Sequence, residues 1–307
     1  MSDHSFTRRD VEFWSGPDRC RAWLYVPEGM DADHRGPIVV MGHGFGAVKW
    51  MCLDRYAERF AEAGYASLVF DYRFFGDSEG SPRELIDIDA QLADWKAAVA
   101  FARSVPEVDP DRVVLWGTSF AGGHVVVTAA QDRRIAAVVS QCPFTDGLAS
   151  ARSSDRSGAA RLGRLIMADL RAARRGDEPV RVPVVGNPGD VALMTSPDAL
   201  SGYRSMVVEG GGEHRDLVPA RIAANVLRYR PGRSARDVRC PILFYVCDAD
   251  SLAPPAAAVK YAAQAPRGRV ERYPGGHFDI YVGEGFERTV DVQIGFLREH
   301  VAPLSPV

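Results

Sequence analysis

A serine flanked by small residues has the spacing of an activated nucleophile. Ser119 lies in the run Gly117-Thr-Ser119-Phe-Ala121, which follows a strand-like segment and opens a helix-like one. Small residues two positions before and after a serine let a strand and a helix approach through a tight turn that exposes the hydroxyl. Ala121 stands where glycine is more usual, and alanine still fits sterically. The same five residues also fit a serine that caps a helix, so the residues around them must decide.

A nucleophilic serine needs a base, and His277 has the position of one. It follows the last strand-like segment on a loop with two preceding glycines, and none of the other six histidines is in that position. The order serine, acid, histidine along the chain is the order expected when a serine follows a parallel strand in this way. A purely structural histidine is the alternative interpretation.

The base in turn needs an orienting carboxylate, and two aspartates are candidates. Asp248 and Asp250 both follow the apolar run 242–247, at the carboxyl end of a predicted strand, where sites in open α/β sheets lie. We favour Asp250 because Pro254 starts the next helix four residues later, and Asp248 is the alternative. Together Ser119, Asp250 and His277 predict nucleophilic catalysis of acyl transfer.

A glycine-rich run near the N-terminal third has the place of an oxyanion loop. Gly42-His-Gly-Phe-Gly46 comes directly after the first predicted parallel strand. A tetrahedral oxyanion needs two preorganised backbone N–H donors, one from this loop and one from the residue after the nucleophile. We assign them to Phe45 and Phe120. The alternative is an ordinary glycine-rich turn between a strand and a helix.

Alternating strands and helices must position these residues. Apolar runs that end in glycine or a polar residue alternate with helical spacing, which predicts an α/β fold with a doubly wound, mostly parallel sheet. A short antiparallel hairpin over 11–15 and 20–26 precedes it. The predicted strands are 37–43, 66–71, 112–117, 135–142, 240–248 and 270–273, and the predicted helices are 56–63, 85–103, 120–131, 254–265 and 284–300.

The alternation stops between residues 145 and 237. Helical pieces over 159–174 and 217–229 surround a Pro/Gly-rich middle, 179–197. An insertion of this length between two sheet strands most economically forms a cap over the carboxyl ends of the strands. We therefore expect a core domain of residues 1–144 and 238–307 and a mainly helical cap, or lid, of residues 145–237.

The length and composition are sufficient for one sizeable core and possibly a smaller subdomain. The chain has 307 residues, 46% of them hydrophobic, and a net charge of -3, which gives no reason to expect nucleic acid or a membrane as partner. No apolar run resembles a secretory signal or a membrane span. The five cysteines are scattered and lack metal-ligand spacing. We expect a cytoplasmic protein with reduced thiols and no metal.

With these motifs the sequence resembles the α/β-hydrolase superfamily. Within it, the sequence is most similar to bacterial serine esterases related to dienelactone hydrolases and acetyl-xylan esterases. The resemblance covers the chain outside the predicted cap. It implies a catalytic triad, an oxyanion hole and no organic cofactor. The matching residues are His43-Gly-Phe-Gly46, Asp71-Tyr-Arg-Phe-Phe-Gly-Asp-Ser-Glu-Gly80, Gly117-Thr-Ser-Phe-Ala121, Asp248-Ala-Asp-Ser-Leu-Ala-Pro254 and Gly275-Gly-His-Phe-Asp279.

The expected activity is hydrolysis of an ester, thioester or lactone of a small organic molecule through an acyl-enzyme on Ser119. The same triad could instead serve acyl transfer, C–C cleavage or elimination of a small acid, and a hydrolase-like fold reused for binding is a further alternative. Phe74 and Phe75 could line the acyl pocket or pack under the cap, and His214 could contact substrate or belong to a polar loop. An exposed face of the cap or of an edge strand could support a homodimer.

Overall fold

A computed structural model describes residues 5–153, 157–208, 211–212 and 214–304. It contains an eight-stranded sheet in the order β1-β2-β4-β3-β5-β6-β9-β10. The β1–β2 hairpin is antiparallel and β2 joins β4 antiparallel, whereas every later neighbour pairs in parallel. The predicted fold class, a doubly wound and mostly parallel sheet, is confirmed. The strands are β1 Phe6–Ser15, β2 Asp18–Pro27, β3 Gly36–Gly42, β4 Ala66–Phe70, β5 Val108–Thr118, β6 Ile135–Gln141, β9 Ile242–Cys247 and β10 Gly268–Tyr273.

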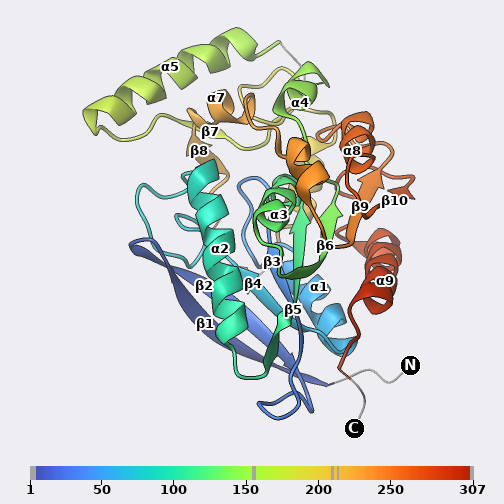
Figure 1. The fold of residues 1–307 in the computed structure, drawn as a ribbon. Helices are drawn as coiled ribbons and strands as arrows, with labels where there is room; N and C mark the ends of the chain where they lie inside the picture. Colours follow the sequence, from blue (N-terminus) through green and yellow to red (C-terminus); the bar gives the residue numbers. More distant parts are fainter. Residues whose placement is uncertain (1–4, 154–156, 209–210, 213, 305–307) are drawn as a thin grey trace.

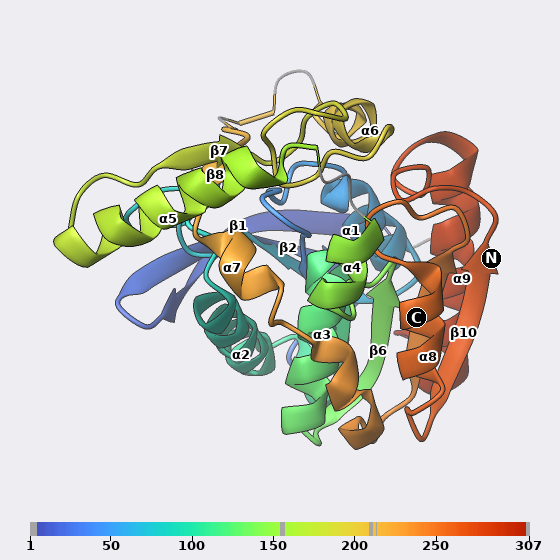
Figure 2. The same ribbon diagram turned by 90° about the horizontal axis from the view of Figure 1, so that it is seen from above.

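Helices cover both faces of the sheet, which is why its central strands are apolar throughout. Every residue of β3, β4 and β9 is buried. Helices α1 and α9 pack on one face, and α2, α3 and α8 lie on the other (Figure 2). Buried polar groups on the sheet are satisfied across these layers, as where Trp116 of β5 donates to Gln293 of α9 at 2.8 Å. The helices are α1 Leu53–Glu62, α2 Ile88–Ser104, α3 Phe120–Gln131, α8 Pro255–Ala262 and α9 Gly283–His300.

The segment predicted as a cap lies beyond the edge of the sheet at which the parallel strands end (Figure 1). It carries one long helix, α5, and several short elements, including a two-stranded sheet, β7–β8. Its last element, η1, returns to the core and packs against α3 and α8. The elements are α4 Gly147–Ser153, α5 Ala159–Arg175, β7 Arg181–Pro183, α6 Ala199–Ser205, β8 Leu217–Pro219, α7 Ile222–Val226 and η1 Pro231–Asp237.

Two expectations for local structure are corrected. The helix predicted over 217–229 is a short strand, β8, followed by the five-residue helix α7. Pro219 explains the difference, because the residue before a proline is driven out of the helical region and the extended segment then pairs with β7. The N-terminal hairpin is longer than predicted, with ten residues in each strand. Within the described residues, no helix combines the length and apolar character needed to cross a membrane.

Candidate active site

Ser119 stands in the tight turn between β5 and α3. Its φ of 56° and ψ of -115° lie outside the regions that a residue with a side chain ordinarily adopts. The turn brings strand and helix so close that a Cβ on Gly117 would lie 2.3 Å from the backbone oxygen of Ala121. Glycine at 117 is therefore required by the close approach, whereas the alanine at 121 is accommodated as predicted. The strain fixes the hydroxyl at the carboxyl end of the sheet.

A hydrogen-bond chain connects Ser119 to His277 and Asp250. The Ser119 Oγ lies 3.0 Å from His277 Nε2, and His277 Nδ1 lies 2.7 Å from Asp250 Oδ2. The other carboxylate oxygen of Asp250 accepts the backbone N–H groups of Leu252 at 2.9 Å and Ala253 at 2.7 Å. The carboxylate is thus held by its own loop and leaves one oxygen for the imidazole. Donor and acceptor distances of this kind are those of a nucleophile, a base and an orienting acid.

The geometry separates Asp250 from the alternative, Asp248. The Asp250 side chain is 1% exposed and faces His277. Asp248 is 38% exposed at its side chain and bonds Arg272 at 2.7 Å on the surface. Of the two aspartates, only Asp250 has a carboxylate bonded to the imidazole.

Burial and charge act in opposite directions on His277. Burial is the largest single influence and disfavours the imidazolium, but the Asp250 carboxylate and the neighbouring Cys142 together outweigh it and raise the pKa of His277 well above its ordinary value. A base with a raised pKa accepts the serine proton more readily once it is neutral. The side chains of His277 and Asp250 are almost completely inaccessible to solvent, so the pair is only weakly screened.

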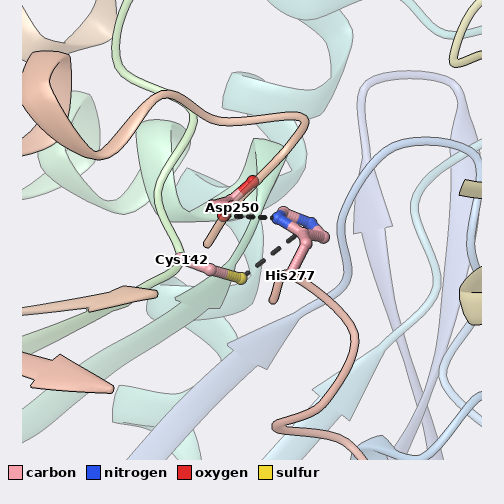
Figure 3. A group of neighbouring side chains, drawn as sticks. All are labelled: Cys142, Asp250 and His277. Atoms are coloured by element: carbon pink, nitrogen blue, oxygen red, sulfur yellow. Dashed lines mark hydrogen bonds and ion pairs between the residues drawn. The ribbon is translucent and has the colours of Figure 1, made fainter. Parts of the chain in front are cut away.

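A thiol lies beside the imidazole. Figure 3 shows Asp250 and Cys142 on the same side of His277, each in contact with the ring, and Cys142 Sγ is 4.0 Å from Nε2. The same sulfur lies 3.5 Å from Thr118 Oγ1 and 3.8 Å from the Tyr281 hydroxyl. The potential ligand atoms of Cys142, Asp250 and His277 are within 4.8 Å of one another, close enough for a metal ion. Because both nitrogens of His277 already bond Asp250 and Ser119, a metal there would have to displace one of these partners. No disulfide involves any of the five cysteines, all of which lie in the described ranges.

The glycine-rich loop after β3 lies directly against the serine. A Cβ on Gly44 would come within 2.8 Å of the Ser119 Cβ. His43 fixes the loop from inside: it accepts the Gly44 N–H at Nδ1 and donates from Nε2 to the Met51 carbonyl at 2.8 Å. Burial lowers the pKa of His43 to about 4, so this histidine stays neutral near pH 7.

Phe45 and Phe120 meet at the serine. Their rings form an edge contact with centroids 5.1 Å apart. Phe120 is the first residue of α3, so its N–H has no acceptor within the helix. Phe45 follows the glycine that touches Ser119. This arrangement is compatible with the two N–H groups as oxyanion donors, and that role stays a prediction.

Two cavities of very different size open at Ser119. The larger has a volume of about 600 Å³ and runs between the sheet edge and the inserted segment. The smaller holds about 20 Å³ on the His277 side. Both are bordered by Phe45, Ser119, Met194 and Leu252. The larger is lined mostly by apolar side chains, which include Phe120, Phe144, Leu148, Leu162, Ile166, Leu193, Val226 and Leu227.

Comparison with known proteins places this arrangement in a family. Residues 37–181 match the family described as alpha/beta hydrolase fold. A relative from Acinetobacter baumannii, named quorum-quenching protein AidA, is 48% identical over 292 residues, covering 95% of each chain. The chain belongs to the α/β-hydrolase superfamily.

Other hydrolase-fold proteins are similar over nearly the whole chain. Thiohydrolase aneE of Aspergillus aculeatus is 29% identical over 311 residues, covering 96% of this chain and 94% of its own. The crystal structure of the alpha/beta hydrolase GrgF from Penicillium sp. is 25% identical, with a TM-score of 0.78 over 96% of this chain and 99% of that one. A structure of DcsB in complex with its substrate analogue gives 27% and 0.79, covering 97% and 100%. The narrower resemblance to dienelactone hydrolases stays a prediction.

The residues predicted to contact substrate lie away from Ser119, and a substrate-binding role for them stays a prediction. Phe74, Phe75 and His214 are not among the residues that border either cavity at Ser119. Phe75 is buried in the core, and Phe74 lies against Gly80 within its own loop. His214 makes an edge contact with Trp50 and lies 3.1 Å from the Tyr203 hydroxyl.

Apart from Phe45, Ser119 and Phe120, the residues that line the larger cavity were not predicted. Leu162 and Ile166 project into the cavity from α5, which is otherwise largely exposed. The spacing of four residues between two large apolar side chains is a signal that could have identified them.

Proposed function

We propose that this protein is a serine hydrolase that cleaves a carboxylic ester, thioester or lactone of a small organic molecule through an acyl-enzyme on Ser119. The observation that carries the proposal is the hydrogen-bond chain from Ser119 Oγ through His277 to Asp250, located where an apolar cavity of about 600 Å³ opens. A pocket of this size and character is typical of small-molecule sites.

In the proposed reaction, His277 Nε2 takes the proton of Ser119 as Oγ attacks the substrate carbonyl. Asp250 stabilises the imidazolium that forms at Nδ1. The carbonyl oxygen becomes an oxyanion and accepts hydrogen bonds from the N–H groups of Phe45 and Phe120. The imidazolium then protonates the leaving alcohol or thiol, and the acyl-enzyme remains. Water, deprotonated by the same imidazole, attacks the acyl carbon and releases the acid and the free serine.

The two cavities suggest how a substrate is oriented. The cavity on the His277 side, about 20 Å³, has room for little more than one water. An acyl chain of any length therefore has to occupy the larger, apolar cavity beneath the inserted segment, which acts as a cap in this proposal. Burial of each methylene contributes about 0.8 kcal/mol, or close to fourfold in affinity, until the cavity is filled. Longer apolar acyl groups are expected to be better substrates up to that limit.

The names of the relatives are consistent with acyl chemistry on small molecules. They include a quorum-quenching protein and a thiohydrolase. A similar chain was solved with a substrate analogue. The name of the thiohydrolase supports testing thioesters beside esters and lactones in any screen.

The first test is whether a fluorophosphonate labels the purified protein, with the modified residue mapped by peptide mass spectrometry. We expect labelling at Ser119 that is lost in His277→Ala. Ester, thioester and lactone panels of increasing acyl length would then identify the substrate class. Full turnover by Ser119→Ala on every accepted substrate would refute the proposal.

Acyl transfer is the second candidate, because other relatives are named polyketide transferases. In that case the acyl-enzyme would pass its acyl group to an alcohol, amine or carbon nucleophile instead of water. Turnover in isotopically labelled water separates the two. A hydrolase incorporates the label into the released acid, whereas a transferase releases an unlabelled acyl product joined to the acceptor.

A further inference from the structure

The short helix α6 of the inserted segment contacts the loops that carry the proposed catalytic groups. Its Tyr203 reaches the glycine-rich loop after β3, and the aspartate before it reaches the loop of Asp250. Its Gly202 lies against the residue that follows His277. Each contact is made by a different residue of one short stretch, 198–203.

The contact to the glycine-rich loop is a buried hydrogen bond. The Tyr203 hydroxyl donates to the Gly46 carbonyl at 2.9 Å, and the side chain is 3% exposed. Because this hydroxyl proton is used by Gly46, His214 Nε2 at 3.1 Å acts as a donor to the tyrosine oxygen. Gly46 has a φ of +71°, a conformation that glycine adopts without strain. The conformation of the loop immediately after Phe45 is therefore held by a side chain of the inserted segment.

The contact to the acid loop is also polar. Ser251, the neighbour of Asp250, donates to Asp198 Oδ1 at 2.6 Å, and Ser196 donates to the same oxygen at 2.9 Å. Asp198 precedes α6, so the start of the helix is bonded to the loop that orients His277. A charge-assisted bond of this length is among the stronger kinds.

The third contact is steric. A Cβ on Gly202 would lie 2.2 Å from the ring of Phe278, the residue after His277. Any larger residue at 202 would push α6 away from the histidine loop. The helix can approach this closely only because position 202 is glycine.

From these contacts we propose that Tyr203 is a positioning residue for the oxyanion hole and that α6 couples the placement of the inserted segment to catalytic competence. This inference rests on the proposed function, in which the N–H of Phe45 is an oxyanion donor. When α6 is docked, the Gly46 carbonyl is fixed, which restrains the loop that carries the Phe45 N–H two peptide units earlier. When α6 is displaced, the carbonyl loses its buried donor and the loop gains freedom to rotate.

A purely structural tyrosine would give a different result from a positioning one. Loss of a buried hydrogen bond lowers stability wherever it occurs, by about 0.5–1.5 kcal/mol. Loss of an oxyanion donor acts on the transition state and costs about 10²–10³ in kcat. A misplaced donor should fall between no effect and that limit, so we expect a roughly tenfold to hundredfold fall in kcat with little change in KM.

The matched control is Tyr65→Phe. Tyr65 is also buried and also donates to a backbone carbonyl, that of Val301 at 2.8 Å, but it lies outside the borders of both cavities. Tyr203→Phe and Tyr65→Phe therefore remove the same group from similar surroundings. Active sites are counted by fluorophosphonate titration, so that kcat is expressed per competent serine.

The decisive measurement compares two ligands. A trifluoromethyl ketone with an apolar chain forms a tetrahedral adduct on the serine whose oxyanion occupies the hole, whereas the matching alcohol fills only the cavity. In Tyr203→Phe the inhibition constant of the ketone should rise by the same factor by which kcat falls. The inhibition constant of the alcohol should stay within twofold of the wild-type value. Equal kcat and equal ketone inhibition in the Tyr203 and Tyr65 variants would overturn the inference.

A second variant covers the case in which Tyr203→Phe is not recovered in folded form. Asp198→Ala removes the bond between α6 and the acid loop and leaves Tyr203 intact. It should reduce kcat and ketone affinity together, and unchanged values would count against coupling through α6. Failure of the proposed function itself would look different, because wild-type protein would then show no Ser119-dependent turnover at all.

Discussion

Replacement of Asp250 by asparagine should nearly abolish activity, and the reason lies in the hydrogen bonds of its two oxygens. Oδ1 accepts two backbone N–H groups, from Leu252 and Ala253, while Oδ2 faces His277. An asparagine amide keeps its oxygen toward the two donors, because an NH₂ group there would oppose both. The NH₂ group must therefore point at His277 Nδ1.

That orientation imposes the wrong tautomer on the imidazole. With a donor facing Nδ1, the ring carries its proton on Nε2, which faces Ser119 at 3.0 Å and can no longer accept the serine proton. The equivalent change in the well-studied serine protease triad lowers kcat about 10⁴-fold. We expect a fall of similar order, about 5.5 kcal/mol in the activation free energy.

The pH dependence should change in a defined direction. Activity requires neutral His277, so in wild-type protein it should rise with pH through a pKa above the usual 6.5 of histidine. In Asp250→Asn burial acts without the opposing carboxylate, and the pKa of His277 falls. The acid limb of kcat/KM in the residual activity should therefore move to lower pH.

The assay is steady-state hydrolysis of the best ester from the screen, normalised to folded protein. The matched control is Asp248→Asn, which removes a carboxylate two residues away that pairs with Arg272 on the surface. Such exposed pairs contribute about 0–1 kcal/mol to stability, and we expect less than about a twofold change in activity. If Asp250→Asn stayed within tenfold of wild type, or if Asp248→Asn were equally damaging, the assignment of the acid would be refuted.

Three further predictions follow from cavity, burial and charge. Gly163 borders the large cavity and a Cβ there would meet nothing within 4 Å, so Gly163→Leu should shorten the longest accepted acyl chain, measured as kcat/KM across chain lengths, without loss of thermal stability. Burial lowers the pKa of His124 to about 3. Below about pH 6.5 this histidine is therefore protonated in the unfolded chain but still neutral in the native protein. Stability linked to His124 is thus present above pH 6.5 and lost below it. Between pH 7 and pH 5 the free energy of unfolding, measured with urea, should fall by about 2 kcal/mol less in His124→Gln than in wild type. Lys49→Met should lower the free energy of unfolding by about 3–5 kcal/mol, because it leaves the fully buried Asp71 carboxylate without its ammonium partner at 2.6 Å; a loss below 1 kcal/mol would contradict this.

The fold and the grouping of Ser119, Asp250 and His277 could be predicted because they depend on local rules. A strand buried on both faces has a continuous apolar run, and the turn at Ser119 needs small residues at fixed offsets. Parallel strands then bring their carboxyl ends to one edge of the sheet. Residues as distant in sequence as Ser119 and His277 can therefore be predicted to be neighbours without knowledge of any individual contact. The sequence leaves Asp248 as an alternative to Asp250, because both follow the same strand two residues apart. The two are separated only by the directions of their side chains in the structure.

The inserted segment followed no such rule. Leu217-Val-Pro219 has apolar residues that suit either a helix or a strand, and its pairing with β7 joins residues up to 38 positions apart, Arg181 and Pro219. For Phe74 and Phe75 the sequence allows either a place in the acyl pocket or packing under the cap, and in the structure Phe74 lies against Gly80 of its own loop while Phe75 is buried in the core. Which side chains line a cavity is decided by packing between segments, and that information is not local.

The glycine-rich loop is held from two sides that differ in kind. On the core side the Lys49 ammonium bonds Asp71 at 2.6 Å and also Asp77, and the Lys49 N–H bonds Asp71 at 2.7 Å. Lys49 and Asp71 are buried charges and costly to separate, whereas the Asp77 side chain is 68% exposed. These contacts depend only on the sheet and its loops. On the other side Tyr203 donates a neutral hydrogen bond to Gly46, and the inserted segment to which it belongs also lines the larger cavity. A neutral hydrogen bond is weaker than the buried ion pair, so the contact from the inserted segment breaks more easily. Because the inserted segment also lines the larger cavity, this weaker contact is the one that responds to filling of the cavity. In that arrangement an acyl chain that stabilises the inserted segment would also stabilise the oxyanion loop, and substrate selection would be expressed in kcat as well as in KM.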